Sequence, residues 1–212
     1  VLMLWWLNLF NFMDGIDGLA ASEALFICAG ASMLIVVRHA PGSDLQLVML
    51  LLMASIAGFL ILNWPPARIF MGDVGSTYLG FVIGVFALDS VSSGQLPFTA
   101  WLVLGSVFWV DSSLTLTRRI LKGERWHAAH RSHAYQRYAS ALSLHFRSRG
   151  QSPSECRASA HRAVTMVAMT INILWLLPLA WLVIIEPSWQ LAWLGLAWLP
   201  LMWLTLYSGL YE

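Results

Sequence analysis

Residues 45–62 read LQLVMLLLMASIAGFLIL, a stretch without a single charged side chain. A bilayer core needs about 20 mostly apolar residues for each helical span, and a transmembrane barrel would instead show short segments of alternating polarity. Residues 1–11 add a partial span. Further apolar stretches of spanning length recur at 19–37, 77–93, 97–117, 163–185 and 189–210. The sequence therefore predicts an all-α fold, a polytopic transmembrane helix bundle.

The composition agrees with a membrane protein. Of the 212 residues, 58% are hydrophobic, 11% are charged and 12 are Trp, which excludes an ordinary soluble domain. No repeat or linker divides the chain, so we expect one membrane domain over residues 1–212. Because Val1 opens inside an apolar run, without a basic region or cleavage site, we expect a C-terminal fragment of a longer protein.

The net charge of +1 hides a strong asymmetry, since ten of the 12 Lys and Arg residues fall between residues 118 and 162. Basic loops stay on the cytoplasmic side of a membrane, so we expect residues 118–162 there. Each pair of spans returns the chain to the same side, which places residues 12–18 and 63–76 there as well. We therefore expect the polar chemistry on the cytoplasmic face.

The first polar segment reads NLFNFMDGIDG over residues 8–18. Asn8, Asn11, Asp14 and Asp17 follow at steps of three, so neighbouring pairs can share a helix face. Carboxylates at a membrane boundary are costly to desolvate unless they are paired or serve a site. The alternative interpretation is a solvated loop in which Asp17 caps the next helix.

The second polar segment reads NWPPARIFMGDVGST over residues 63–77. It places Asp73 between glycines, directly before an apolar helix whose free N–H groups can bind anions and whose first turn Ser76 or Thr77 can cap. Proteins often supply a single carboxylate to an Mg²⁺ ion that also binds phosphate oxygens of the substrate. The guanidinium group of Arg68 can neutralise a diphosphate. The alternative is that the glycines and Asp73 only build a turn.

The third segment reads RRILKGERWHAAHRSHAYQR over residues 118–137. His127, His130 and His133 recur at intervals of three and can line one helix face, where imidazoles bind phosphate or donate to a leaving nucleotide. A zinc site would call for a His pair four apart with an acid or Cys nearby. The alternative is a loop that only supplies cytoplasmic positive charge, and residues 138–162 read as a surface helix or turn.

Three acids, Glu23, Asp89 and Asp111, lie within or near the apolar spans, where any ionisable side chain is a functional candidate. We expect Asp89, which lies nearer the outer interface, to be solvated. We expect Asp111 to face the site or to bond a neighbouring helix. We expect Glu23 to form a hydrogen bond within the bundle.

The three segments, in this order and separated by spans, resemble the polyprenyl-phosphate N-acetylhexosamine-1-phosphate transferase family. NLFNFMDGIDGL is similar to its N-x-x-N-x-x-D-G-x-D-G-L motif, RIFMGDVGST to its F-M-G-D-x-G-S motif, and HRSHAYQ to its third motif, usually D-R-x-H-x-H-H. The family includes the muramoyl-pentapeptide translocase of peptidoglycan synthesis and the enzymes that initiate O-antigen, enterobacterial common antigen and teichoic acid assembly.

The resemblance implies the roles of individual residues. Asp73 would be the main Mg²⁺ ligand, with Asn11 assisting through its amide oxygen. Asp14 and Asp17 would lie at the reacting centre as the catalytic pair. Residues expected to bind substrate are Asn8, Arg68, His130, Arg131, Ser132 and His133.

The resemblance also implies an activity, the Mg²⁺-dependent transfer of a sugar-1-phosphate from a UDP-sugar to undecaprenyl phosphate in the bacterial inner membrane. Expected partners are the UDP-sugar, undecaprenyl phosphate and membrane lipid, without nucleic acid, and a homodimer is compatible with the sequence. Tyr135 and Gln136 replace the last two histidines of the third motif. This variation is similar to the branch that starts lipopolysaccharide O-antigen synthesis, and it argues against the muramoyl enzyme.

Two other functions fit parts of the sequence. Acids and glycines near interrupted helices also suit ion-coupled transporters, although transporter sites tend toward the bilayer midplane rather than one face. The family's upstream acidic pair is absent from this chain, so a catalytically inactive lipid-binding fragment is the other alternative.

Overall fold

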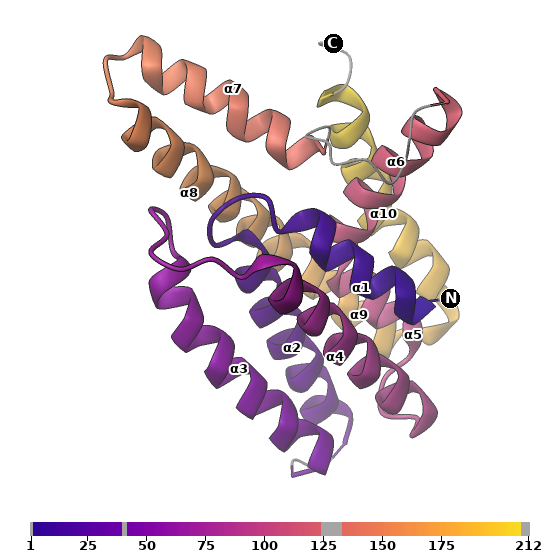
Figure 1. Ribbon diagram of the computed structural model, residues 1–212. Coiled ribbons are helices and arrows are strands. Elements are labelled where there is room, and N and C mark those ends of the chain that lie inside the picture. Colours follow the sequence, from indigo (N-terminus) through magenta and orange to yellow (C-terminus); the bar gives the residue numbers. More distant parts are fainter. Residues whose placement is uncertain (1, 40–41, 124–132, 209–212) are drawn as a thin grey trace.

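The computed structural model describes residues 2–39, 42–123 and 133–208, with no strand in these three segments (Figure 1). The prediction of an all-α fold is confirmed. The helices are α1 (Leu2–Met13), α2 (Leu19–Arg38), α3 (Asp44–Asn63), α4 (Gly72–Ser92), α5 (Phe98–Leu104), α6 (Ser106–Leu121), α7 (Ala134–Ser148), α8 (Pro153–Ile171), the π-helix η1 (Asn172–Leu176), α9 (Leu177–Ile185), the 3-10 helix η2 (Pro187–Trp189) and α10 (Gln190–Ser208).

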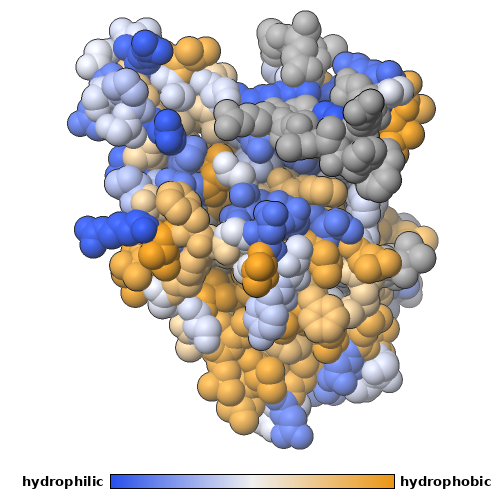
Figure 2. All heavy atoms as spheres, viewed as in Figure 1, coloured by the Kyte–Doolittle hydropathy of each residue, from blue (hydrophilic) through white to orange (hydrophobic). Residues whose placement is uncertain are grey.

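Within the described segments, five helical stretches are long and apolar enough to cross a membrane. They are α2, α3, α4, the continuous run from Pro153 to Ile185 and the run from Pro187 to Ser208. The apolar surface gathers over the lower part of the molecule, and hydrophilic side chains gather at the opposite end (Figure 2). The molecule is thus a multi-pass membrane protein, and α1, with 12 residues, is the predicted partial span.

The predicted apolar stretch over residues 97–117 does not form one straight helix, because the chain bends by 80° between α5 and α6, which together are long and apolar enough for a broken span or a re-entrant loop. Gly105 lies at the bend with φ −89° and ψ 11°, outside the helical region. A Cβ atom at this position would lie 2.8 Å from the ring of the fully buried Trp6. The glycine therefore lets the bend pack directly against α1.

Helices α1 and α4 lie side by side in antiparallel orientation (Figure 1). A Cβ atom at Gly80 would lie 2.7 Å from the carbonyl oxygen of Trp6, so the two backbones approach as closely as a small residue allows. Farther along the same interface, Asn11 meets Ser76. This packing brings the end of α1 to the beginning of α4, where the first two polar segments meet.

A polar pair joins α2 to η1 inside the bundle. The amide nitrogen of Asn172 donates to the carboxyl oxygen Oε2 of Glu23 over 2.6 Å, and both side chains are fully buried. The prediction that Glu23 forms a hydrogen bond within the bundle is confirmed. Asn172 is also the first residue of the π-helix, where the helical hydrogen-bond pattern changes.

Candidate active site

The first polar segment is divided between a helix and a loop. Helix α1 ends at Met13, so Asn8 and Asn11 are helical while Asp14 and Asp17 lie in the turn before α2. The turn needs Gly15, because a Cβ atom there would lie 2.2 Å from the hydroxyl of Tyr135. Both aspartates therefore lie in the turn between α1 and α2, at the hydrophilic end of the bundle.

The second polar segment enters a helix earlier than its apolar pattern predicts. Helix α4 begins at Gly72, and Asp73 lies exposed in its first turn, where a negative charge is favourable. The amide of Asn11 donates to Asp73 Oδ1 over 3.2 Å and to Ser76 Oγ over 3.3 Å. The structure therefore brings together the two residues that the family resemblance assigns to the metal.

The expected capping by Ser76 or Thr77 is wrong. Since α4 begins at Gly72, both hydroxyls lie inside the helix, and each donates to a carbonyl of the preceding turn, at Gly72 or Asp73. The residue at the N-cap position is Met71, which makes no side-chain cap.

Asp17 links three segments of the chain. Its Oδ2 atom accepts the backbone N–H of Ala67 over 3.2 Å and lies 3.3 Å from Nδ1 of His161. Its own backbone N–H donates to the same Nδ1 over 3.2 Å. Asp17 does not cap α2, because Gly18 occupies the N-cap position with φ 79° and no side-chain hydrogen bond. The capping interpretation is therefore wrong.

Asp14, Asp17, Asp73 and His161 line an open cavity of about 750 Å³ at the hydrophilic end of the bundle. The loop before α2 supplies the carboxylates of Asp14 and Asp17 to its wall, and the first turn of α4 supplies that of Asp73. The hairpin of α7 and α8 supplies the opposite wall, including Gln136, Ser140, Ser143, Arg157 and His161. We call this the polar cavity.

Negative charge accumulates in the polar cavity. Burial, together with the charges of Asp73 and Asp17, raises the pKa of Asp14 to about 7. Arg157 is the only permanently charged base among the described residues of the wall. The surplus of negative charge suits a cation, and carboxylate and amide oxygens are the ligands that Mg²⁺ takes from proteins.

No group of three or more His, Cys, Asp or Glu side chains is placed to hold a metal ion within residues 2–39, 42–123 and 133–208. A site of one carboxylate and one amide nevertheless fits Mg²⁺, which commonly keeps several waters and takes further oxygens from substrate phosphates. Asp73 and Asn11 form such a pair.

The remaining predicted residues lie away from the polar cavity or outside the described segments. The Asn8 amide donates to the Leu4 carbonyl over 2.6 Å, and the exposed Arg68 is not part of the cavity wall. His133 is 3% exposed and stacks between Phe12 and Tyr135. Three further predicted residues, His130, Arg131 and Ser132, lie outside the described residues.

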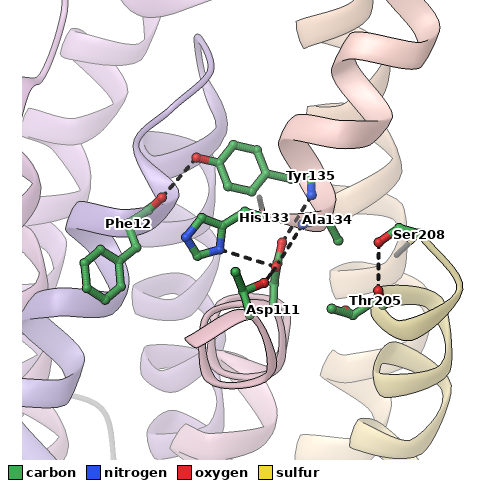
Figure 3. A network of polar contacts seen from close by, with 8 residues as sticks. Phe12, Asp111, His133, Ala134, Tyr135, Thr205 and Ser208 are labelled. Atoms are coloured by element: carbon green, nitrogen blue, oxygen red, sulfur yellow. Dashed lines mark hydrogen bonds and ion pairs between the residues drawn. The ribbon is translucent and has the colours of Figure 1, made fainter. Parts of the chain in front are cut away.

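A buried network explains where His133 and Tyr135 lie (Figure 3). Asp111 accepts the backbone N–H groups of Ala134 and Tyr135 over 3.0 and 3.2 Å, and it lies 3.4 Å from His133 Nδ1. The Tyr135 hydroxyl donates to the Phe12 carbonyl over 3.0 Å. Asp111 thus bonds a neighbouring helix, one of its two predicted roles, and the network fixes the beginning of α7 over the polar cavity.

The sequence interpretation missed the wall formed by α7 and α8. Residues 138–148 and 153–162 are helical and a turn joins them, and several of these residues line the site instead of the outer surface alone. Two signals were present: a capping box from Ser152 to Glu155 that starts α8, and Arg157 and His161 four residues apart on one helix face. The partners of that face lie more than 140 residues away, beyond the reach of local spacing.

A separate apolar groove of about 410 Å³ lies along α2. Helix α2 forms most of its wall, with Leu60 of α3 and Met169 of α8 on its flanks, and η1 and α9 complete it. Leu60 lies one helical turn from Asn63, and Met169 two turns from His161, two residues of the polar cavity wall. We call this the apolar groove.

The N-terminal part of the chain is similar in sequence to known proteins. A family model described as glycosyl transferase family 4 matches residues 1–91. A probable undecaprenyl-phosphate N-acetylglucosaminyl 1-phosphate transferase of Bacillus subtilis is 35% identical over 61% of this chain and 36% of its own length. Phospho-N-acetylmuramoyl-pentapeptide-transferases of Chlamydia muridarum and Chlamydia trachomatis are 38% and 42% identical, each over 50% of this chain and 30% of their own length.

The chain thus spans about a third of the length of the curated relatives it matches. The matched region contains both aspartate-bearing segments. The comparisons confirm the family resemblance, and the family model covers the first two of the three motifs.

Proposed function

We propose, from the membership of this chain in the polyprenyl-phosphate hexosamine-1-phosphate transferase family, that the protein transfers a hexosamine-1-phosphate from a UDP-sugar to undecaprenyl phosphate. One observation carries the proposal: carboxylates from two separate motifs converge on an open polar cavity at one end of a membrane bundle. The reaction transfers a sugar-1-phosphate from a water-soluble nucleotide sugar to a membrane lipid phosphate, and a polar cavity at the end of a membrane bundle can be reached by both substrates.

In the proposed reaction, an oxygen of the lipid phosphate attacks the β-phosphorus of the UDP-sugar. A new P–O bond forms while the bond from that phosphorus to the bridging oxygen breaks, and UMP leaves with the electron pair. Asp14 and Asp17 orient the lipid phosphate, and Asp14, with a pKa of about 7, accepts its remaining proton. An aspartate nucleophile that forms a covalent intermediate is the second route the chemistry allows.

Asp73 and Asn11 are the residues we propose for Mg²⁺, the second through its amide oxygen. When bound, the ion would neutralise the diphosphate and the departing UMP. Arg157 offers a further positive charge from α8 for a phosphate group.

The apolar groove supports a lipid acceptor. Helices α3 and α8 contribute residues both to the groove and to the polar cavity, so we propose that a phosphate in the cavity and an isoprenoid chain in the groove belong to one molecule. The basic residues between 118 and 162 favour a cytoplasmic location for the polar cavity. We propose the bacterial inner membrane, where undecaprenyl phosphate is available.

The pathway is proposed from the third motif. Tyr135 and Gln136 replace two histidines, as in the O-antigen branch, and the Tyr135 hydroxyl bonds the Phe12 carbonyl. We therefore favour the first membrane step of O-antigen or a related envelope polysaccharide. The curated relatives named above act on N-acetylglucosaminyl or N-acetylmuramoyl-pentapeptide groups by their names, so the donor sugar must be measured.

The test uses membranes that contain the full-length protein, undecaprenyl phosphate, Mg²⁺ and radiolabelled UDP-N-acetylhexosamines. Butanol-extractable label and released UMP are expected, both lost with EDTA. Asp73→Asn should abolish turnover, because an amide is a weaker Mg²⁺ ligand than a carboxylate.

Asp89→Asn is the matched control, since Asp89 is exposed near the other end of α4. Wild-type turnover by Asp73→Asn would exclude the proposed metal ligand. Uptake of label into vesicles without any lipid product would favour a transporter instead.

A further inference from the structure

We propose that His161 is a positioning residue for the transfer reaction, which holds Asp17 in place on the wall of the polar cavity. The inference deepens the proposed function and rests on it. His161 belongs to none of the three sequence motifs and comes from α8, far along the chain from Asp17.

The contact is close and largely shielded from solvent. Nδ1 of His161 lies 3.3 Å from Oδ2 of Asp17 and 3.2 Å from its backbone nitrogen. The two side chains are 13% and 16% exposed. A shielded polar contact of this kind restrains both partners more strongly than one in open solvent.

One nitrogen atom of His161 serves both contacts. An unprotonated Nδ1 accepts the backbone N–H of Asp17, whereas a protonated Nδ1 donates to its carboxylate. In either form the ring ties the aspartate to α8. The requirement is therefore for a hydrogen-bonding group at the Nδ1 position and not for one protonation state.

Asp17 is held from two sides. The N–H of Ala67 binds Oδ2 from the loop before α4, and His161 approaches the same oxygen from α8. Because both contacts engage Oδ2, the carboxylate can offer its other oxygen to a substrate in the cavity. Loss of either contact would let the side chain turn, and small displacements of a reacting group reduce turnover steeply.

The position of His161 also couples the two walls of the polar cavity. Arg157 lies one helical turn earlier on the same face of α8 and lines the cavity with it. By joining Asp17 to α8, His161 fixes the distance between the carboxylates and this cation. The phosphate-binding groups of the two walls are thus held in one arrangement.

The deciding experiment compares His161→Asn with His161→Gln in the full-length protein. Both replacements are neutral amides, but Asn places its amide near the Nδ1 position, while Gln extends toward the Nε2 position. We expect Asn to retain kcat within about threefold, and Gln and Ala to lower kcat about 10- to 100-fold, with both KM values nearly unchanged.

Arg162→Gln is the matched control, because Arg162 is exposed on α8 and is not part of the cavity wall. Wild-type kinetics are expected. Equal kcat values for the Asn and Gln variants would overturn the positioning role, and this comparison decides the question even where Ala lowers the folded yield.

Hydrogen–deuterium exchange supplies a readout that does not depend on turnover. Gln and Ala at position 161 should increase deuterium uptake in residues 14–18, whereas Asn should preserve the wild-type uptake. Unchanged uptake in all variants would contradict the role of His161. Absence of lipid-linked product from the wild type would instead contradict the proposed function.

Discussion

At the scale of single residues, Asp14 gives the site a pH dependence. Its folded pKa of about 7 lies above the ordinary value of 3.8, because burial and two neighbouring carboxylates disfavour the charged form. An acid whose pKa is higher in the folded state than in the unfolded state begins to destabilise the protein when the unfolded state loses its proton. This destabilisation is absent below pH 3.8, grows between pH 3.8 and 7, and is complete above pH 7.

We therefore expect Asp14→Asn to stabilise the metal-free protein at pH 8 but not at pH 4. A shift of this size corresponds to at most about 4 kcal/mol, and partial solvent screening reduces our expectation to about 1–2 kcal/mol. The measurement is the thermal unfolding midpoint of wild type and variant in EDTA at both pH values. An equal difference at pH 4 and pH 8 would show that Asp14 is not the group responsible.

Single residues also show how far the sequence could predict the site. Asn11 and Asp73 were assigned to one metal from their motifs, and their side chains lie 3.2 Å apart. His161 was not found, because its contact with Asp17 spans 144 positions and depends on the packing of α8 against α2. A sequence motif indicates the chemistry of a short segment, whereas contacts between distant segments depend on how the helices pack.

At the scale of helices, the pair of Glu23 and Asn172 joins α2 to η1 within the bundle. We expect Asn172→Leu to destabilise the protein by about 1–2 kcal/mol, because it leaves a buried carboxyl without its partner. Glu23→Gln should cost less, since a neutral amide can still accept the bond from Asn172. Thermal unfolding in detergent measures both.

The matched variant for this pair is Thr170→Leu, because Thr170 is exposed on the last turn of α8 and bonds only its own helix at Met166. Its stability should equal that of the wild type. If Asn172→Leu is no less stable than Thr170→Leu, the buried pair contributes nothing to the joining of α2 and η1.

Helix existence was predictable, whereas helix ends and bends were not. The apolar runs identified α2, α3 and α10 within a few residues, because spanning length and hydropathy fix them. The bend at Gly105 escaped prediction because the apolar run continues through it, and the bend packs against Trp6 of α1, which is distant in the sequence. Hydropathy alone contains no information on such contacts.

At the scale of the whole molecule, hydrophilic and apolar side chains are separated along the long axis of the helix bundle. Hydrophilic side chains gather mainly at one end, and apolar side chains predominate over the lower part of the visible face (Figure 2). The loop directly before α2 lines the polar cavity and α2 itself lines the apolar groove, while α3 and α8 contribute different residues to each. That residues 1–212 form one domain stays a prediction, as does the cytoplasmic location of the polar end.

If the isoprenoid chain lies in the apolar groove, a change in the groove should alter the KM for a long acceptor but not the KM for a short one. Ala29 lines the groove, so Ala29→Phe should obstruct it without touching the polar cavity. We expect the KM for undecaprenyl phosphate to rise about tenfold, because the chain loses part of its apolar contact. For a prenyl phosphate too short to enter the groove, the KM of Ala29→Phe should equal that of the wild type.

Val48→Phe provides the control, since Val48 is 47% exposed on α3 and is not part of the groove wall. It should leave the KM unchanged for both acceptors. Because kcat with the short acceptor reports the chemistry of the polar cavity separately, a loss of activity with both acceptors would indicate damage to the fold. An equal KM for the long acceptor in Ala29→Phe and wild type would mean that the isoprenoid chain follows another face of the bundle.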